Sequence, residues 1–175
     1  MRPMLCKLFI PTPAVEREVE LLERGLANYS QSLLCQAVEI AIDRANYVNG
    51  EYDYLKALRI SAGLFLEEKL KEAFGGHWWE NIRSEAEGEY EQSVVNLVVE
   101  LSEIPTDWDG VSSLYASFKT FIEEHGYLIG LACINISLEY KDSTFTDKEF
   151  MEMLEDLTAQ ESQEDREKVL REWLK

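Results

Sequence analysis

Apolar side chains recur every three or four positions along most of the chain, and this spacing predicts amphipathic helices. The first pattern opens with Thr12, an N-cap residue, and Pro13, which suits the first helical position. It continues to about Tyr47, after which Asn49 and Gly50 indicate a helix end. We therefore expect one long first helix, whose apolar stripe is formed by Val15, Val19, Leu22, Leu26, Tyr29 and Leu33.

A second helical pattern covers about residues 52–74, and Gly75 and Gly76 end it. Two long amphipathic helices joined by a short turn pack antiparallel, so we expect a long helical hairpin that forms about half of the core. The segments Gly50–Tyr52 and Lys56–Leu58 resemble one half of a tetratricopeptide repeat. A solenoid needs about three repeats at a period of about 34 residues, so the resemblance implies a single helical hairpin.

Two further stretches fit a helix and a strand almost equally well. Residues 89–104 contain many branched apolar side chains, which favours a strand, but their apolar positions continue at helical spacing. Residues 127–140 alternate from Ile134 onwards, as a strand would. The helical spacing up to Ile104 decides for a helix in the first stretch. In the second stretch a lone strand would have no partner in this chain, so we predict a helix there too.

The last part of the chain contains three more helical patterns. One covers about residues 111–124. Thr146 and Glu149 form a capping box that opens the next, and Ser162 opens a short last helix. The fold class that we expect is all-α: a single acidic domain over residues 1–175, built as a bundle of seven or eight helices that opens with the long antiparallel hairpin.

The charge of the chain narrows the choice of partners. The sequence has 34 acidic and 17 basic residues, a net charge of -17, and only residues 1–50 are nearly neutral. Such a surface repels the phosphates of a nucleic acid, so we expect no direct nucleic-acid binding. The longest apolar run, residues 127–134, is far shorter than the roughly 20 residues of a membrane-spanning helix. We therefore expect no membrane association either.

The residues that usually carry chemistry form no recognisable motif. The three cysteines are far apart in the sequence, which indicates a reducing, cytoplasmic compartment. His125 and Cys133 are the one Cys–His pair worth naming, and Cys133 lies in an apolar segment where a thiol is inert. The acidic segment that starts at Asp107 lacks the oxygen ligands of a calcium-binding loop. We predict no catalytic residues, no metal site and no cofactor.

The remaining clue is a dense acidic stretch near three tryptophans. Residues 80–124 carry 11 acidic and 2 basic side chains. Exposed aromatic rings surrounded by carboxylates make good anchors for a basic partner, and the opposite charges speed association. The partner-binding residues that we predict are Trp78, Trp79, Glu85, Glu87, Glu89, Trp108, Asp107 and Asp109.

Three functions fit these observations. We favour a non-enzymatic acidic protein that occludes a basic partner, such as a nuclease toxin or a nucleic-acid-binding protein, as an immunity protein, an inhibitor or a nucleic-acid mimic would. The alternative is a helical-repeat-like scaffold that holds a peptide or a partner helix, and the third is an enzyme with an unrecognised site. Two questions stay open: whether the stripe of the first helix mediates a homodimer, and whether the acidic surface only keeps the protein soluble.

Overall fold

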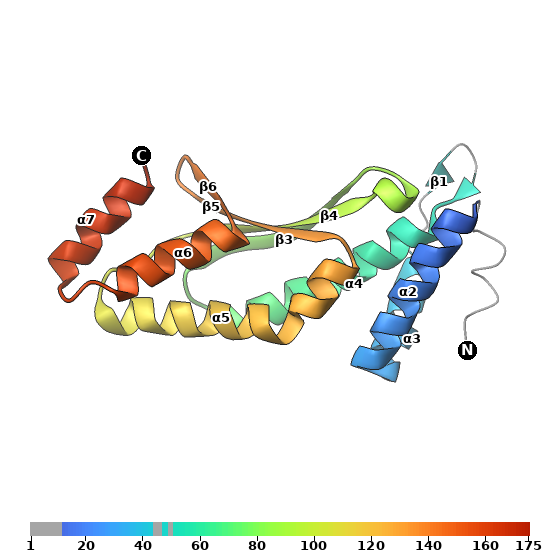
Figure 1. Ribbon diagram of the computed structural model, residues 1–175, viewed down its shortest axis with the longest axis horizontal. Helices are drawn as coiled ribbons and strands as arrows, with labels where there is room; N and C mark the ends of the chain where they lie inside the picture. The colour runs from blue at the N-terminus through green and yellow to red at the C-terminus, as the bar shows by residue number, and fades with distance from the viewer. Residues whose placement is uncertain (1–11, 44–46, 49–50) are drawn as a thin grey trace. The chain divides into compact units, whose positions relative to one another are not determined.

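The computed structural model describes residues 12–43, 47–48 and 51–175, with the backbone alone at 47–48 and 51–52. This part of the chain contains six α-helices, a two-stranded ribbon and a four-stranded sheet, so the fold is mixed α/β (Figure 1). The prediction of an all-α helical bundle is therefore wrong. The sheet has the order β3-β4-β5-β6, with β3 at Trp79–Glu87, β4 at Val94–Leu101, β5 at Ile134–Tyr140 and β6 at Ser143–Thr146.

The strand β4 explains most of this error. It lies inside the sheet, and Val95, Leu97, Val98, Val99 and Leu101 are all buried. Val95, Leu97, Val99 and Leu101 share one face of the strand, whereas the other face carries Val94, Asn96, Val98 and Glu100, of which only Val98 is buried. The two valines on this second face hide the alternation that is typical of a strand. Such a run fits helical spacing as well as a strand does, and this is why residues 89–104 suggested a helix.

The strand β5 pairs with β4, a partner that the sequence pattern did not indicate. Its buried residues Ile134, Ile136 and Leu138 alternate as in a strand, so the prediction of a helix over residues 127–140 is wrong from Ile134 onwards. The N–H of Val95, in β4, donates to the carbonyl of Cys133, just before β5, at 3.2 Å. The two strands thus start side by side, as parallel neighbours do, and parallel neighbours need a long crossover.

That crossover is the helix α5, Trp108–Leu131. It runs beyond the predicted end near residue 124, and Gly126 and Gly130 lie inside it. The strand β6 pairs antiparallel with β5, with Leu138 opposite Phe145. Parallel and antiparallel pairing therefore occur in the same sheet.

The predicted long first helix is two helices. Thr12 caps α2, Pro13–Tyr29, as expected, because its hydroxyl accepts the N–H of Val15 at 3.3 Å. The helix ends before Ser30, whose backbone is extended, and α3 follows at Gln31–Asp43. The hydroxyl of Ser30 accepts the N–H of Leu33 at 3.4 Å, a capping bond that competes with a continuous helix. The predicted long opening hairpin is therefore wrong.

A small ribbon separates α3 from the next helix. Its strands β1, Tyr47–Val48, and β2, Glu51–Tyr52, pair antiparallel. The expected helix end at Asn49 and Gly50 lies outside the described residues.

Three helices agree with the sequence patterns. The helix α4, Tyr54–Phe74, ends at Gly75, whose φ of 60° suits a glycine. Both hydrogen bonds of the capping box at Thr146 are formed at the start of α6, Asp147–Thr158. The helix α7, Gln163–Trp173, begins where the hydroxyl of Ser162 accepts the N–H of Asp165.

The chain divides into two compact units. Unit 1 is Met1–Leu66, Ser84–Asn96 and Tyr127–Ile134, and unit 2 is Glu67–Arg83, Leu97–Gly126 and Asn135–Lys175. Four residues of the predicted stripe are buried inside unit 1, namely Val15, Val19, Leu22 and Leu26, whereas Tyr29 is half-buried. The expectation of one domain over the whole chain stays a prediction.

The core of unit 2 is built on aromatic rings. Phe118 in α5 packs edge-on against Phe150 in α6, with ring centroids 5.2 Å apart. Phe74 contacts Phe118 from the end of α4, and Phe145 contacts Phe150 from β6. These contacts between buried rings hold α5 and α6 in place, and both helices carry the surface residues described next.

Candidate functional site

The most prominent surface feature of unit 2 is Trp108 at the start of α5. All four tryptophans lie in the described residues, and Trp108 alone is classed as exposed, at 52%. The guanidinium carbon of Arg166 lies 5.8 Å from the centre of its ring. Arg166 is itself buried, and it donates to the carbonyls of Thr106 at 2.6 Å and Gln160 at 3.0 Å. An arginine held by two carbonyls therefore supports an exposed indole ring.

Trp108 stands between two aspartates in the sequence, at the N-terminus of α5. Asp107 accepts the N–H of Gly110 with its side chain at 2.9 Å, and its carbonyl accepts the N–H of Val111. Asp109 lies exposed in the first turn. Negative charge is favourable at a helix N-terminus because of the exposed N–H groups there. We call Asp107, Trp108 and Asp109 the Trp108 patch.

The other two predicted tryptophans serve mainly internal contacts of unit 2. Trp78 is half-buried, packs edge-on against Phe74 at 6.3 Å between ring centroids, and accepts the N–H of Ser102 with its carbonyl. Trp79 is also half-buried, and its indole N–H donates to the carbonyl of Gly75 at 2.7 Å. Both rings thus brace the turn between α4 and β3.

The three predicted glutamates belong to unit 1. Glu85, Glu87 and Glu89 are all exposed, in β3 and just after it. Glu87 accepts a hydrogen bond from the amide of Asn96 in β4 at 3.2 Å. The predicted set is therefore divided between the two units, and only Asp107, Trp108 and Asp109 form one continuous patch.

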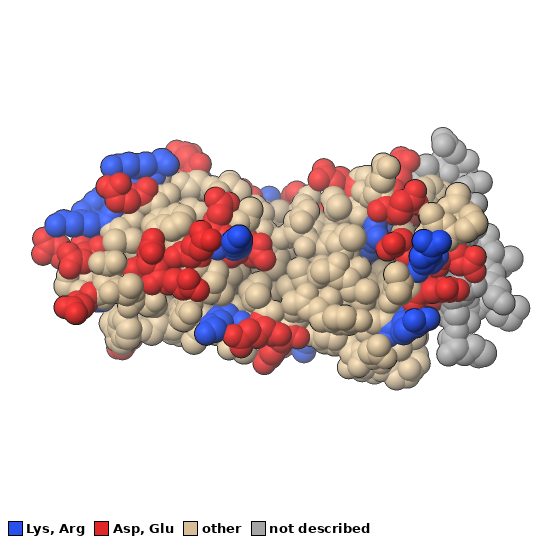
Figure 2. All heavy atoms as spheres, viewed as in Figure 1, with Lys and Arg blue, Asp and Glu red and all other residues tan. Residues whose placement is uncertain are grey.

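The sequence analysis missed the most acidic element of unit 2. Unit 2 has 22 acidic and 10 basic residues, a net charge of -12, whereas unit 1 has 12 and 7, a net charge of -5. Figure 2 shows acidic side chains gathered over α6. Glu149, Glu152, Glu155 and Asp156 of this helix are exposed. The sequence window at 80–124 ended before this helix.

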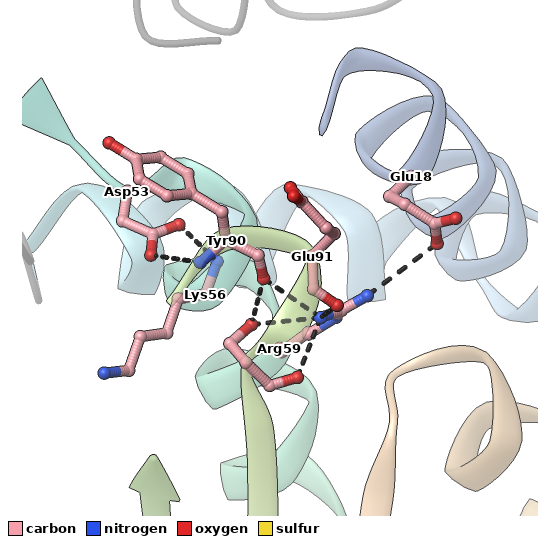
Figure 3. Close-up of polar contacts among 7 residues, drawn as sticks. Glu18, Asp53, Lys56, Arg59, Tyr90 and Glu91 are labelled. Carbon is pink, nitrogen blue, oxygen red and sulfur yellow. Dashed lines mark hydrogen bonds and ion pairs between the residues drawn. The ribbon is translucent and has the colours of Figure 1, made fainter. Parts of the chain in front are cut away.

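The close-up in Figure 3 shows a buried arginine in unit 1. Arg59, in α4, is only 2% exposed, and its Nη1 lies 2.8–3.2 Å from the carbonyl oxygens of Tyr90, Glu91 and Ser93. Its Nη2 is 3.7 Å from a carboxylate oxygen of Glu18. A buried guanidinium needs such acceptors, and here they hold the connection between β3 and β4.

A buried carboxylate holds the same connection from its other side. Asp53 is inaccessible, and it accepts the N–H of Tyr90 at 2.8 Å and the N–H of Lys56 at 3.0 Å (Figure 3). The second bond caps α4. Since Asp53 and Arg59 are buried, this cluster stabilises the fold of unit 1 and is closed to a ligand. An arginine inside an otherwise apolar helical pattern was the sequence signal for it.

Unit 2 also contains a pocket of about 510 Å³ between α4 and α5 that is open to solvent, and we call it the cavity. His125 forms part of its wall and is 8% exposed, and burial lowers its pKa although the nearby Glu124 acts in the opposite direction. Its Nε2 lies 3.8 Å from a carboxylate oxygen of Glu124. The cavity is lined by Lys69, Glu72, Ala73, Ala116, Ser117, Thr120, Phe121, Glu124 and His125.

Other candidate chemistry finds little support in the described part of the chain. Among those residues, no three His, Cys, Asp or Glu side chains come together as metal ligands would. No helix there combines the length and the apolar character needed to cross a membrane. Cys35, which is exposed, and Cys133, which is half-buried, are both free thiols.

Comparisons of this chain with protein-family models, with curated protein sequences and with solved structures found no match.

Proposed function

We propose that this protein binds a positively charged protein and covers its basic surface, without catalysing a reaction. The binding surface consists of the Trp108 patch together with the exposed carboxylates of α6. The observation that carries the proposal is Trp108 itself: an exposed indole ring that packs on Arg166 and lies between Asp107 and Asp109 in the sequence.

The geometry suits a binding anchor because the ring is already held in place. A side chain that is ordered before binding loses little conformational entropy when the partner arrives. Exposed tryptophans are enriched among the residues that dominate binding energy. Arg166 bonds the carbonyl of Gln160, just after α6, so the patch is tied to the end of the acidic helix.

The charge of unit 2 indicates the class of partner. A net charge of -12 over unit 2 attracts a basic surface and repels nucleic acids. The partners that fit are proteins whose own basic face binds nucleic acid, such as a nuclease toxin, and occupying that face would inhibit them. Free thiols at Cys35 and Cys133 support action in the cytoplasm.

The test compares what four versions of the full chain retain from a nuclease-treated lysate of the native cell, identified by mass spectrometry. The versions are the wild type, Trp108→Ala, the double variant Glu152→Lys/Glu155→Lys in α6, and a control, Glu39→Lys/Asp43→Lys. The control changes two exposed acids of α3 in unit 1 by the same amount of charge. We expect a basic protein to bind the wild type and the control, and to be lost from the other two.

Salt and mass measurements separate this proposal from the other functions. Binding that weakens strongly at high salt supports charge recognition. Salt-insensitive binding that survives Trp108→Ala would instead favour the peptide-holding scaffold. A homodimer would appear as twice the chain mass of 20.2 kDa in light scattering of the pure protein. Reversing Glu85, Glu87 and Glu89 together tests whether unit 1 contributes to the binding surface.

A further inference from the structure

The cavity between α4 and α5 is separate from the Trp108 patch and shares no residue with it. Its volume of about 510 Å³ lies in the range of small-molecule sites, roughly 300–1,000 Å³. Small side chains open it: Ala73 on α4 and Ala116 on α5 face the hollow, and Phe121 supplies an apolar wall. The space suits a ligand with a short apolar body.

The charges around the cavity determine whether a positively or a negatively charged ligand is favoured. Its lining contains two carboxylates, Glu72 and Glu124, against one ammonium group, Lys69. Lys69 and Glu72 form an ion pair at 3.5 Å. Because His125 is buried and its pKa is lowered, its imidazole is neutral at pH 7 and adds no positive charge. The lining thus has an excess of one negative charge.

Polar groups that can orient a ligand lie on the same wall. Ser117 and Thr120 contribute hydroxyl groups, which both donate and accept hydrogen bonds, and His125 contributes a ring nitrogen. These groups, together with a carboxylate, match the needs of an ammonium group: several acceptors and a negative charge nearby. An anion would meet a net negative lining, and a purely apolar molecule would leave these groups without water.

We propose that this cavity binds a small organic amine in its ammonium form, with the apolar body against Phe121 and the two alanines and the ammonium group toward Glu124. The inference does not depend on the proposed function, since the Trp108 patch can bind a protein whether or not the cavity is occupied.

Three probes of similar size that differ mainly in charge test this proposal: benzylamine, benzyl alcohol and benzoate. Each is titrated at pH 7.5 into the full chain, and the imidazole proton signals are followed by NMR. The chain has only two histidines, and His77 does not line the cavity, so it serves as an internal reference. We expect benzylamine to shift the His125 signal saturably, about fivefold more tightly than benzyl alcohol, with benzoate weakest.

Variants of the cavity make the outcome decisive. Ala116→Leu fills the hollow at an exposed helix position and should abolish the benzylamine shift. Glu124→Gln should bring benzylamine level with benzyl alcohol, whereas Glu123→Gln, an exposed neighbour outside the lining, should change nothing. The proposal is overturned if benzoate binds as well as benzylamine, if Ala116→Leu leaves the shift intact, or if benzylamine gives no saturable shift.

Discussion

Arg59 in unit 1 and Arg166 in unit 2 are the two buried arginines of the described residues, and they have different consequences. Both bind backbone carbonyl groups, and they are 2% and 5% exposed. Arg59 bonds three carbonyls of one connection and faces Glu18, so all its contacts stabilise the interior. Arg166 instead lies under the exposed ring of Trp108. Hydrogen bonds from a buried arginine to backbone carbonyls thus stabilise the interior of unit 1, whereas in unit 2 they hold an arginine beneath an exposed tryptophan ring.

The largest effect should come from Arg59→Met. This change removes the guanidinium donor from the buried carbonyl of Ser93 and from the partly buried carbonyls of Tyr90 and Glu91, and we expect a loss of about 3 kcal/mol in the free energy of unfolding. Urea denaturation followed by circular dichroism measures it. The control is Arg83→Met, which removes a half-exposed ion pair with Glu100 and should cost less than about 1 kcal/mol. Equal losses in the two variants would show that Arg59 does not hold the connection between β3 and β4.

Trp108→Ala should separate binding from stability. We expect a loss of about 2 kcal/mol in binding to the basic partner, roughly a 30-fold rise in Kd, because an ordered anchor is removed. The free energy of unfolding should change by less than about 1 kcal/mol, since much of the ring is already exposed. Calorimetric titration and urea denaturation of the same preparation give both numbers. A large loss of stability with an unchanged Kd would show that Trp108 stabilises the fold and does not bind the partner.

Gly110→Ala tests how the Trp108 patch is positioned. A Cβ at Gly110 would lie 2.6 Å from Cβ of Pro105 and 2.8 Å from a carboxylate oxygen of Asp107, so the turn must shift. We expect a loss of about 1–2 kcal/mol in the free energy of unfolding. The matched control, Gly126→Ala in the same helix, has open space around the added carbon and should be stabilising by up to about 1 kcal/mol. Thermal denaturation that moves both variants in the same direction would contradict this.

The smallest effect concerns pH. Burial lowers the pKa of His125, so the folded chain binds a proton at this site less readily than the unfolded chain, whose histidine titrates near pH 6.5. The contribution of neutral His125 to stability is therefore present above that pH and is lost as the pH falls below it. Urea denaturation of wild type and His125→Gln between about pH 7.5 and 5 should show their difference shrinking.

The sequence predicted the features of the fold that depend on neighbouring residues. The caps at Thr12, Thr146 and Ser162 and the end of α4 at Gly75 were found because each signal lies within one helical turn. The four-stranded sheet was missed because Val94 and Val98 on the half-exposed face of β4 hide its alternation, and β5 becomes a strand only when β4 lies beside it. Pairing of this kind depends on residues far apart in the sequence.

The same distinction holds for the candidate site. The order of residues in the sequence was enough to place Trp108 between two aspartates, because the three residues are adjacent. It did not locate Arg166, whose bond to Thr106 joins residues 60 positions apart, or the acceptors of Arg59, which are 31–34 positions away. The cavity at His125 also requires α4 and α5 to be packed together, which no local pattern indicates.

The central claim, that the Trp108 patch binds a basic protein, is tested most directly by comparing wild type with Trp108→Ala in the nuclease-treated lysate, at low and at high salt. The account predicts that a basic nucleic-acid-binding protein is retained by the wild type at low salt, is reduced at high salt, and is lost with Trp108→Ala. Retention of the same proteins by both versions at both salt concentrations would contradict it.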